Sequence, residues 1–391
     1  MSQTLRGQDE ALRLLRAAVH SGHVGHAYLF HGPAGVGKTR AALLFAQALL
    51  CERPLESGES CGTCPSCEAV LALRHPDLEL LVPLPTFRTE GRTERQAEEA
   101  RSEARANVLR RMAAEPFFTP VFSRPAVHSV EDLARAKQFL ALTAQREGGA
   151  KVLIVKGAEA ITGPAAHAFL KVLEEPQPRR VLILGARQPK ALLPTIASRC
   201  LLVRFRPLST ALIGEALAQR GVSKPVARLI AATSQGSLGR ALALLEPALD
   251  TTVQSAPGEA EFTKLRAAAF ELFVRPKTPA VLGPLRRARI ERDRTRFMAA
   301  TSLASYYYRD VLRRKLLGAG AEIANADLER DVDADARALA VSDLTERIRI
   351  LDEIGTAVQS NVTAAYAVAA AQTRMGLGPD DARVPARHAH A

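Results

Sequence analysis

The chain has 391 residues, about twice the size of one ordinary domain, so we expect two or three separately packed cores. Apolar residues make up 47% and charged residues 24%, which is typical of a globular protein, and no uncharged run reaches the roughly 18 residues of a membrane span. The net charge of +12 favours encounters with nucleic acid without showing contact. The N-terminal sequence lacks the apolar core of a secretory signal, so a cytoplasmic protein is expected.

The first half of the chain alternates short apolar runs with helical patterns. This alternation is typical of an α/β domain in which a mostly parallel sheet is flanked by helices. We predict that this domain covers residues 1–206. Its predicted strands are residues 27–31, 78–82, 125–128, 152–155, 181–185 and 201–205.

After Pro207 only helical periodicities remain. Residues 207–250 predict a small helical lid, and residues 259–375 predict a separate all-helical domain after a polar stretch. The tail at 376–391 has no apolar periodicity and is expected to be disordered. The predicted helices are residues 211–220, 225–233, 238–249, 262–274, 288–317, 342–360 and 362–375.

A charged segment at about 86–116 interrupts the first domain. Its helical pattern, at residues 88–111, is crowded with arginine and glutamate between Pro85 and Pro116. We interpret it as a surface insertion that forms a solvated helix, in preference to a dedicated binding element.

Residues 32–39 read Gly-Pro-Ala-Gly-Val-Gly-Lys-Thr and fit the phosphate-loop spacing G-x-x-x-x-G-K-[ST] between a predicted strand and a helical run at 40–50. The glycines let backbone N–H groups face the phosphates, the lysine reaches the outer phosphates, and the threonine hydroxyl suits Mg²⁺. ATP or ADP, possibly with Mg²⁺, is the expected ligand, and a loop that has lost nucleotide binding is the alternative. The expected phosphate-binding residues are Gly32, Gly35, Gly37, Lys38 and Thr39.

ATP hydrolysis also needs an acidic residue that holds Mg²⁺ at the end of a neighbouring strand. The best candidate strand, at 152–155, continues into Lys156 and Gly157, and a lysine there competes with the metal. Glu159 compensates only if the strand ends later. Asp77 precedes its strand and is expected at the opposite edge of a parallel sheet. We therefore predict nucleotide binding with weak or no turnover.

Four cysteines are spaced C-x9-C-x2-C-x2-C within residues 51–67. Four thiolates close a tetrahedral site suited to structural zinc, with an iron–sulfur cluster as the main alternative. A reducing cytoplasm disfavours disulfides. Cys200 is expected to be a buried thiol and no fifth ligand. The predicted ligands are Cys51, Cys61, Cys64 and Cys67.

Several motifs in order resemble the bacterial DNA polymerase III clamp-loader subunits of the AAA+ superfamily, over roughly residues 5–249. Besides the phosphate loop and the cysteines, these are Gly7-Gln8, residues 26–30 (HAYLF), His75-Pro76-Asp77, residues 168–176 (AFLKVLEEP), Ser198-Arg199-Cys200 and residues 236–242 (GSLGRAL). Tyr308-Arg309-Asp310 resembles a segment of the collar helices. The resemblance implies an AAA+ nucleotide-binding domain, a lid and an all-α collar that holds the subunit in a hetero-oligomeric ring.

The resemblance also implies a role for Arg199, which would reach ATP on a neighbouring subunit as an arginine finger. The implied partners are the gamma/tau and delta subunits, and through the complex the sliding clamp and primed DNA at the replisome. An ordinary surface arginine is the alternative for this residue.

Differences from the ATPase (motor) subunits of this family indicate which type of subunit the chain resembles. Lys156 and Gly157 stand where motors carry an acidic pair, Ala186 where they carry threonine, and Arg240 one place after their lid arginine. The combination is similar to the delta-prime type, a stator that assists clamp loading and hydrolyses ATP poorly. The alternatives are an active gamma/tau-type ATPase and a zinc-containing AAA+ regulator outside replication.

Overall fold

The computed structural model describes residues 5–377, without residues 86–92, 116, 119, 121, 123–125, 162, 176, 246–257, 277–281, 289, 292 and 360–361. Most of the predicted polar stretch, Pro176 of the resembled helix and the predicted tail from residue 378 lie outside the described residues. Contacts divide the chain into two compact units, Met1–Leu212 with Gly236–Arg240, and Ile213–Gln235 with Ala241–Ala391. The predicted boundaries at 1–206, 207–250 and 259–375 remain predictions.

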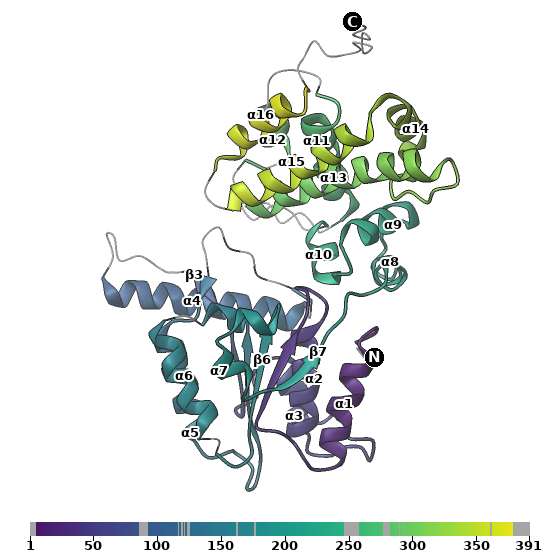
Figure 1. The fold of residues 1–391 in the computed structure, drawn as a ribbon. Helices are drawn as coiled ribbons and strands as arrows, with labels where there is room; N and C mark the ends of the chain where they lie inside the picture. Colours follow the sequence, from purple (N-terminus) through teal and green to yellow (C-terminus); the bar gives the residue numbers. More distant parts are fainter. Residues whose placement is uncertain are drawn as a thin grey trace, which may run out of the picture. The chain divides into compact units, whose positions relative to one another are not determined.

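The first unit is built on a five-stranded parallel sheet with the strand order β2-β5-β6-β1-β7 (Figure 1). The expected α/β class is confirmed, and five predicted strands lie in this sheet within a residue or so of their predicted bounds. They are β1 Ala27–His31, β2 Leu78–Leu81, β5 Lys151–Lys156, β6 Arg180–Ala186 and β7 Leu201–Arg204.

The sixth predicted strand, at 125–128, does not join this sheet. Ala126–Val127 forms β4, which pairs antiparallel with β3 (Leu84–Pro85) in a separate two-stranded sheet. Residue 125 lies outside the described residues. Among the described residues this ladder consists of the pairs Leu84–Val127 and Pro85–Ala126.

Both faces of the main sheet are covered by helices, because successive strand side chains point to opposite faces. On β5, Val152 and Ile154 enter one core with α1, α2 and α3, whereas Leu153 and Val155 enter the other with α5, α6 and α7. The first three helices are α1 Asp9–His20, α2 Lys38–Leu50 and α3 Pro65–Leu71, and the others are α5 Val130–Ala141, α6 Pro164–Glu174 and α7 Pro194–Ala197. Short 3-10 turns follow β5 (η1, Ala158–Ala160) and β6 (η2, Pro189–Ala191).

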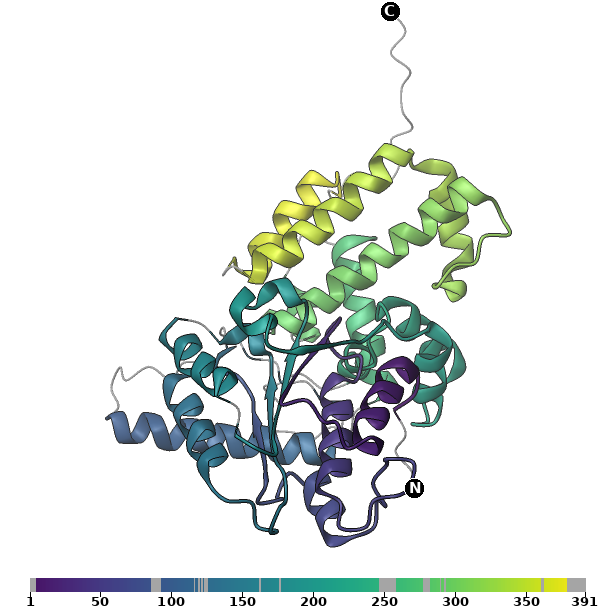
Figure 2. The ribbon, with the colours of Figure 1, turned by 60° about the horizontal axis from the view of Figure 1, so that its bottom comes forward.

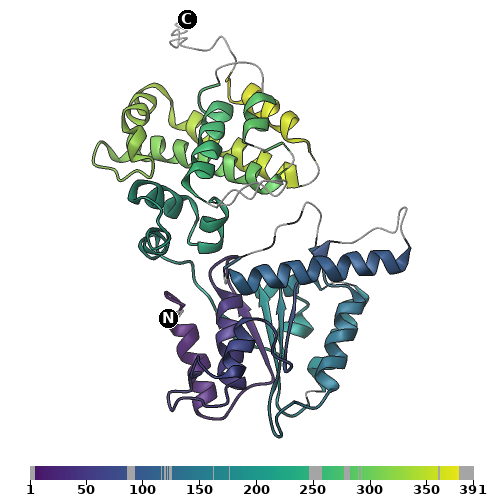
Figure 3. The same ribbon diagram turned by 180° about the vertical axis from the view of Figure 1, so that it is seen from behind.

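The predicted insertion forms α4, Glu94–Ala114, a long helix of the first unit (Figure 3). It is not solvated on every side, as the interpretation of the sequence assumed. Arg101 is 7% exposed and contacts the carboxylate of Asp132, which also accepts a hydrogen bond of 2.8 Å from Arg105. Met112 enters the core beside the sheet. One face of the charged helix is therefore anchored to α5 and to the core.

The second unit contains helices and no strand among its described residues, as predicted for this part of the chain. Helices α13 and α15 run side by side (Figure 2), and the buried Tyr308 hydroxyl donates to the carbonyl of Phe273 at 2.8 Å. The predicted helix at 288–317 is shorter, and α14 was missed because its sequence is mostly charged. The bounds are α8 Thr210–Ala218, α9 Lys224–Thr233, α10 Leu238–Ala243, α11 Glu259–Phe273, α12 Leu282–Arg287, α13 Arg294–Leu317, η3 Ala326–Leu328, α14 Glu329–Ala338, α15 Val341–Gln359 and α16 Ala364–Arg374.

No helix among the described residues is both long and apolar enough to cross a membrane.

The amino edge of the main sheet holds a buried ion pair. Asp77, one residue before β2, lies 2.9 Å from the Nζ of Lys151 on β5, and both side chains are 5% exposed or less. Asp77 also accepts the backbone N–H of Gln145. As predicted, this carboxylate lies away from the carboxyl ends of the strands, where the phosphate loop begins.

Asp77→Ala should destabilise the first unit by about 3 to 5 kcal/mol, because it leaves the ammonium of Lys151 buried without its partner. Glu10→Ala removes the exposed ion pair with Arg206 and should cost about 1 kcal/mol or less. Urea unfolding, followed by circular dichroism and by amide exchange in β2 and β5, measures both. Equal losses in the two variants would contradict the prediction.

Candidate functional site

The predicted phosphate loop connects β1 to α2 at the carboxyl edge of the sheet. Gly32, Gly35 and Gly37 have φ values of 146°, 72° and 105°, in the region that favours glycine. A Cβ on Gly32 would collide with the carbonyl oxygen of Phe205, which follows β7. The glycines that the sequence marks as phosphate-binding are therefore also required by the backbone conformation and by the close approach of the β7 exit.

The start of α10 packs directly on this loop. The N–H of Gly239 donates to the carbonyl of Gly35 at 2.9 Å, and a Cβ on Gly239 would lie 2.9 Å from the Cα of Gly35. Ser237 also borders Gly35. This explains the glycine at 239 in the resembled lid motif. The side chain of Arg240 is exposed and is not among the described residues that line the nucleotide pocket.

Gln8 also holds the phosphate loop in place, through hydrogen bonds of its side chain. Its buried amide donates to the carbonyl of Val36 at 3.2 Å and to that of Arg206 at 2.8 Å, and it accepts the N–H of Arg206 at 3.1 Å. The Gly7-Gln8 motif therefore ties the phosphate loop to the end of β7. This contact joins residues almost 200 positions apart, and only the resemblance pointed to it.

A pocket of about 540 Å³ opens beside the phosphate loop. Lys38 and Thr39 line it, and the ammonium of Lys38 donates to the carbonyls of Gly32 and Pro33 at 2.6 Å each. Burial lowers the pKa of Lys38 to about 8, the carboxylate of Glu159 opposes the shift and Arg187 adds to it. Gly35, Gly37, Lys38 and Thr39 thus border one cavity lined by basic side chains, and Gly32 is not among the described residues that line it.

The strand ends that border this pocket carry the residues expected from the sequence. Strand β5 ends at Lys156, and Gly157 turns the chain with φ 64°. Ala186 ends β6. Burial, reinforced by the charge of Lys38, lowers the pKa of Lys156 to about 8. A cation and two residues without side-chain ligands thus occupy the edge where a catalytic site would place acidic and polar groups.

Glu159 reaches the pocket although the strand ends where the sequence predicted. The 3-10 turn at Ala158–Ala160 carries its side chain into the lining, with one oxygen 3.8 Å from the Nε of Arg187. Its other oxygen is buried without a hydrogen bond. Sequence reasoning treated a longer strand as the condition for this placement and missed that the turn suffices.

The far wall of the pocket comes from the segment after α4, which the sequence analysis did not assign to any site. Phe117, Phe118, Pro120 and Phe122 line the cavity, and the carbonyl of Phe118 lies 3.4 Å from the Nζ of Lys156. An apolar run directly after a charged helix was the available signal. The segment that follows the insertion therefore contributes to the wall of the candidate nucleotide site.

The four predicted metal ligands converge in space. Their Sγ atoms lie within 4.8 Å of one another, and Cys51–Cys64 and Cys61–Cys67 are 4.0 and 3.9 Å apart. A tetrahedral metal with bonds of about 2.3 Å to sulfur needs sulfurs about 3.8 Å apart. All four are free thiols, and the N–H groups of Cys61 and Cys67 donate to cluster sulfurs. The cluster can therefore hold a metal ion such as zinc.

The thiols differ in their electrostatic surroundings. Burial raises the pKa of Cys51 and Cys67, whereas a backbone hydrogen bond at Thr63 is the main cause that lowers the pKa of Cys61 to about 6. A bound cation favours the thiolate form at all four positions. Cys200 lies outside the cluster, half-buried, and its thiol donates to the carbonyl of Ile196.

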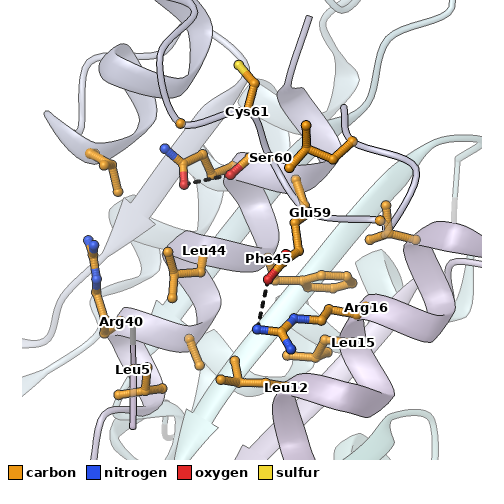
Figure 4. A pocket seen from close by; sticks show the side chains of 18 of the residues that line it. Leu5, Leu12, Leu15, Arg16, Arg40, Leu44, Phe45, Glu59, Ser60 and Cys61 are labelled. Carbon is orange, nitrogen blue, oxygen red and sulfur yellow. Dashed lines mark hydrogen bonds and ion pairs between the residues drawn. The ribbon is translucent and has the colours of Figure 1, made fainter. Parts of the chain in front are cut away.

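The cysteine loop is docked on α1 and α2 beside a second pocket of about 490 Å³, shown in Figure 4. Arg16 on α1 pairs with Glu59 of the loop at 2.8 Å, and the Ser60 hydroxyl donates to Gln47 on α2 at 3.0 Å. Cys61 borders the same pocket. Because α2 begins at the phosphate loop, the cluster braces the helix that carries Lys38.

Arg199 lies on the surface between α7 and β7 and is not among the described residues lining the nucleotide pocket. Its guanidinium is 3.0 Å from the carboxylate of Glu174 at the end of α6 and donates to the carbonyl of Thr195 at 2.9 Å. The side chain is 38% exposed. Its position leaves it accessible to another molecule.

The family described as DNA polymerase III, delta subunit, matches residues 7–209, which is more than half of the chain. The chain belongs to this family. The matched region contains the main sheet, the phosphate loop, the cysteine cluster and Arg199.

The similar proteins include DNA polymerase III subunit delta' of Pseudomonas aeruginosa, 39% identical over 175 residues, which are 45% of this chain and 41% of that protein. The protein of the same name from Bacillus subtilis is 31% identical over 225 residues, 57% of this chain and 55% of that one. The chain thus spans about half the length of these relatives. A solved gamma subunit-related protein of Thermotoga maritima covers 94% of this chain and 99% of its own at 16% identity, with a TM-score of 0.48.

Cys64→Ser should abolish stoichiometric metal binding, because the buried Cys64 supplies one of four clustered thiols and serine is a poor substitute for a thiolate. Metal analysis of the purified chain and titration of the apoprotein with Co²⁺ measure the effect. Cys200→Ser is the matched control and should keep one metal ion per chain. A Cys64→Ser protein with a full metal complement would contradict the assignment.

Proposed function

We propose that this chain is the delta-prime subunit of a bacterial DNA polymerase III clamp loader and assists the ATP-dependent loading of the sliding clamp on primed DNA. The match to the family and the relatives named delta' support this proposal. Its direct partners would be the gamma/tau and delta subunits, with the clamp and DNA engaged through the complex in the cytoplasm.

The chain binds ATP or ADP and hydrolyses ATP poorly. Gly32, Gly35, Gly37, Lys38 and Thr39 hold the phosphates at the start of α2. The single observation that carries weak turnover is Lys156 at the end of β5, bordering the same pocket as Lys38. A metal-binding carboxylate is needed there for phosphoryl transfer.

Arg199 acts on a neighbouring subunit as an arginine finger. Its exposure, its position outside the described lining of the nucleotide pocket and the family motif around it support this role. The contact with Glu174 does not forbid it, because an ion pair this exposed contributes only about 0 to 1 kcal/mol. The pair would instead hold the guanidinium in place until the neighbour's phosphates compete for it.

The metal in the cysteine cluster is zinc with a structural role. Four protein thiolates leave no open coordination position, and the closed cluster braces α2 instead of facing the nucleotide pocket. An iron–sulfur cluster is distinguished from zinc by metal analysis and by visible absorption.

Each predicted domain would have its own role in the loader. Residues 1–206 would bind nucleotide, with the metal knuckle at 51–67 and the insertion at about 86–116, and residues 207–250 would form the lid. Residues 259–375 would form the collar through which the ring assembles, and 376–391 a tail. The helical character of the described residues in the lid and collar supports this division.

An active gamma/tau-type ATPase is the second candidate. Glu159 favours it, since its carboxylate lines the nucleotide pocket with one oxygen free of hydrogen bonds. Two observations weigh against it. Lys156 stands at the strand end itself, and Arg187 lies 3.8 Å from the Glu159 carboxylate.

The isolated chain should bind labelled ATP and release phosphate at a negligible rate. In the reconstituted loader with primed DNA, Arg199→Ala should reduce turnover at the neighbouring site by roughly 10³-fold, because the arginine stabilises charge on the transferred phosphoryl group. Equilibrium binding and steady-state phosphate release are the measurements.

Arg146→Ala is the matched control, since it removes an exposed arginine that lies between α5 and β5. It should leave turnover unchanged. Robust hydrolysis by the isolated chain would favour the gamma/tau candidate, and failure to assemble with the other loader subunits would overturn the clamp-loader proposal itself.

A further inference from the structure

We propose that Lys156 binds the phosphate oxygens of the nucleotide in the place of a divalent metal ion, so that this chain takes up ATP or ADP without Mg²⁺. This inference rests on the proposed nucleotide binding and adds a ligand to it. It differs from the expectation that the nucleotide is bound together with Mg²⁺, which the sequence left as a possibility.

The backbone fixes Lys156 at the edge of the pocket. It is the last residue of β5 and pairs in register with Gly185 on β6, the strand next to β1. The ring of the buried His128 is hydrogen-bonded to the Lys156 carbonyl at 2.9 Å, and Gly157 turns the chain away immediately afterwards. The strand end therefore cannot shift easily, and the side chain starts from a rigid position.

The ammonium groups of Lys38 and Lys156 border one cavity with too little negative charge to balance them. Arg40 and Arg187 add two more cations to the lining, and Glu159 is the one carboxylate among the described lining residues. Burial lowers the pKa of both lysines, and the charge of Lys38 lowers that of Lys156 further. A polyphosphate removes this electrostatic cost because it supplies negative charge to both ammonium groups.

The donor set does not suit Mg²⁺. This ion requires near-octahedral coordination by oxygen ligands, usually with one or two protein carboxylates in addition to the phosphates. Among the described residues that line the pocket, the side-chain oxygens suited to Mg²⁺ are the hydroxyl of Thr39 and the carboxylate of Glu159. This carboxylate lies 3.8 Å from the Nε of Arg187. A lysine at the strand end repels a divalent cation at the position where a carboxylate would attract it.

The Lys156 ammonium has donors to spare for a ligand. Its hydrogen bond to the carbonyl of Phe118 is long, at 3.4 Å, and an ammonium carries three protons. A lysine placed as a point charge is a common phosphate ligand in proteins. Phosphate oxygens can therefore recruit Lys156 at little cost.

The test measures equilibrium binding of a fluorescent ATP analogue to the full chain, with excess EDTA or with Mg²⁺. The wild-type chain should bind about equally well in both conditions. Lys156→Ala should bind about 10- to 100-fold more weakly in EDTA, the range expected for loss of a charge-assisted hydrogen bond. Lys156→Arg should keep metal-free binding, and Lys156→Asp should bind only when Mg²⁺ is present.

Lys137→Ala, which removes an exposed lysine from α5, is the matched control and should bind like the wild type. Wild-type binding that requires Mg²⁺, or Lys156→Ala binding equal to wild type in EDTA, would overturn the role of Lys156 and leave the nucleotide site standing. Absence of binding to the wild type in both conditions would instead overturn the proposed nucleotide function.

Discussion

The parallel pairing of β5, β6 and β1 is the constraint on which the nucleotide site depends. Parallel strands end at the same edge of a sheet, so the phosphate loop after β1, Lys156 at the end of β5 and Ala186 at the end of β6 border one space. No loop needs to bend far to bring them together. The chemistry of the site is then set by the residue types at these strand ends.

Those residue types favour holding a nucleotide over hydrolysing it. The loop supplies backbone donors and Lys38, which suit phosphate, whereas the neighbouring strand end supplies a second cation. An inert nucleotide is useful in a subunit that acts on its neighbour, because the occupied loop can order the domain without a cycle of hydrolysis. In that arrangement Arg199 would be the residue of this chain that acts in ATP hydrolysis, at the site of a neighbouring subunit.

Two peripheral elements pack against the helices of this domain. The cysteine cluster follows α2 and is tied to it through Ser60 and Gln47, so a bound metal ion would stiffen the helix that begins at the phosphate loop. The inserted helix α4 is anchored by Arg101 and Asp132, and the aromatic segment after it lines the pocket. A buried arginine of this kind requires its carboxylate partner, which explains why a charged helix docks instead of remaining in solvent.

Local sequence patterns determined much of this protein. Apolar runs marked the strands of the main sheet, the glycine spacing marked the phosphate loop, and four cysteines marked the metal cluster, because each pattern reports a short-range requirement of the backbone or of coordination. The order of motifs added the family. The residue at the end of β5 was also predictable, since one strand boundary decides it.

Only the tertiary structure decided which distant segments meet. It brought Glu159 into the pocket through a 3-10 turn, set Gly239 against Gly35, and paired Arg199 with Glu174. It also separated β4 from the main sheet. These contacts depend on strand order and on the close approach of backbones far apart in sequence, and no local window of residues encodes either of them.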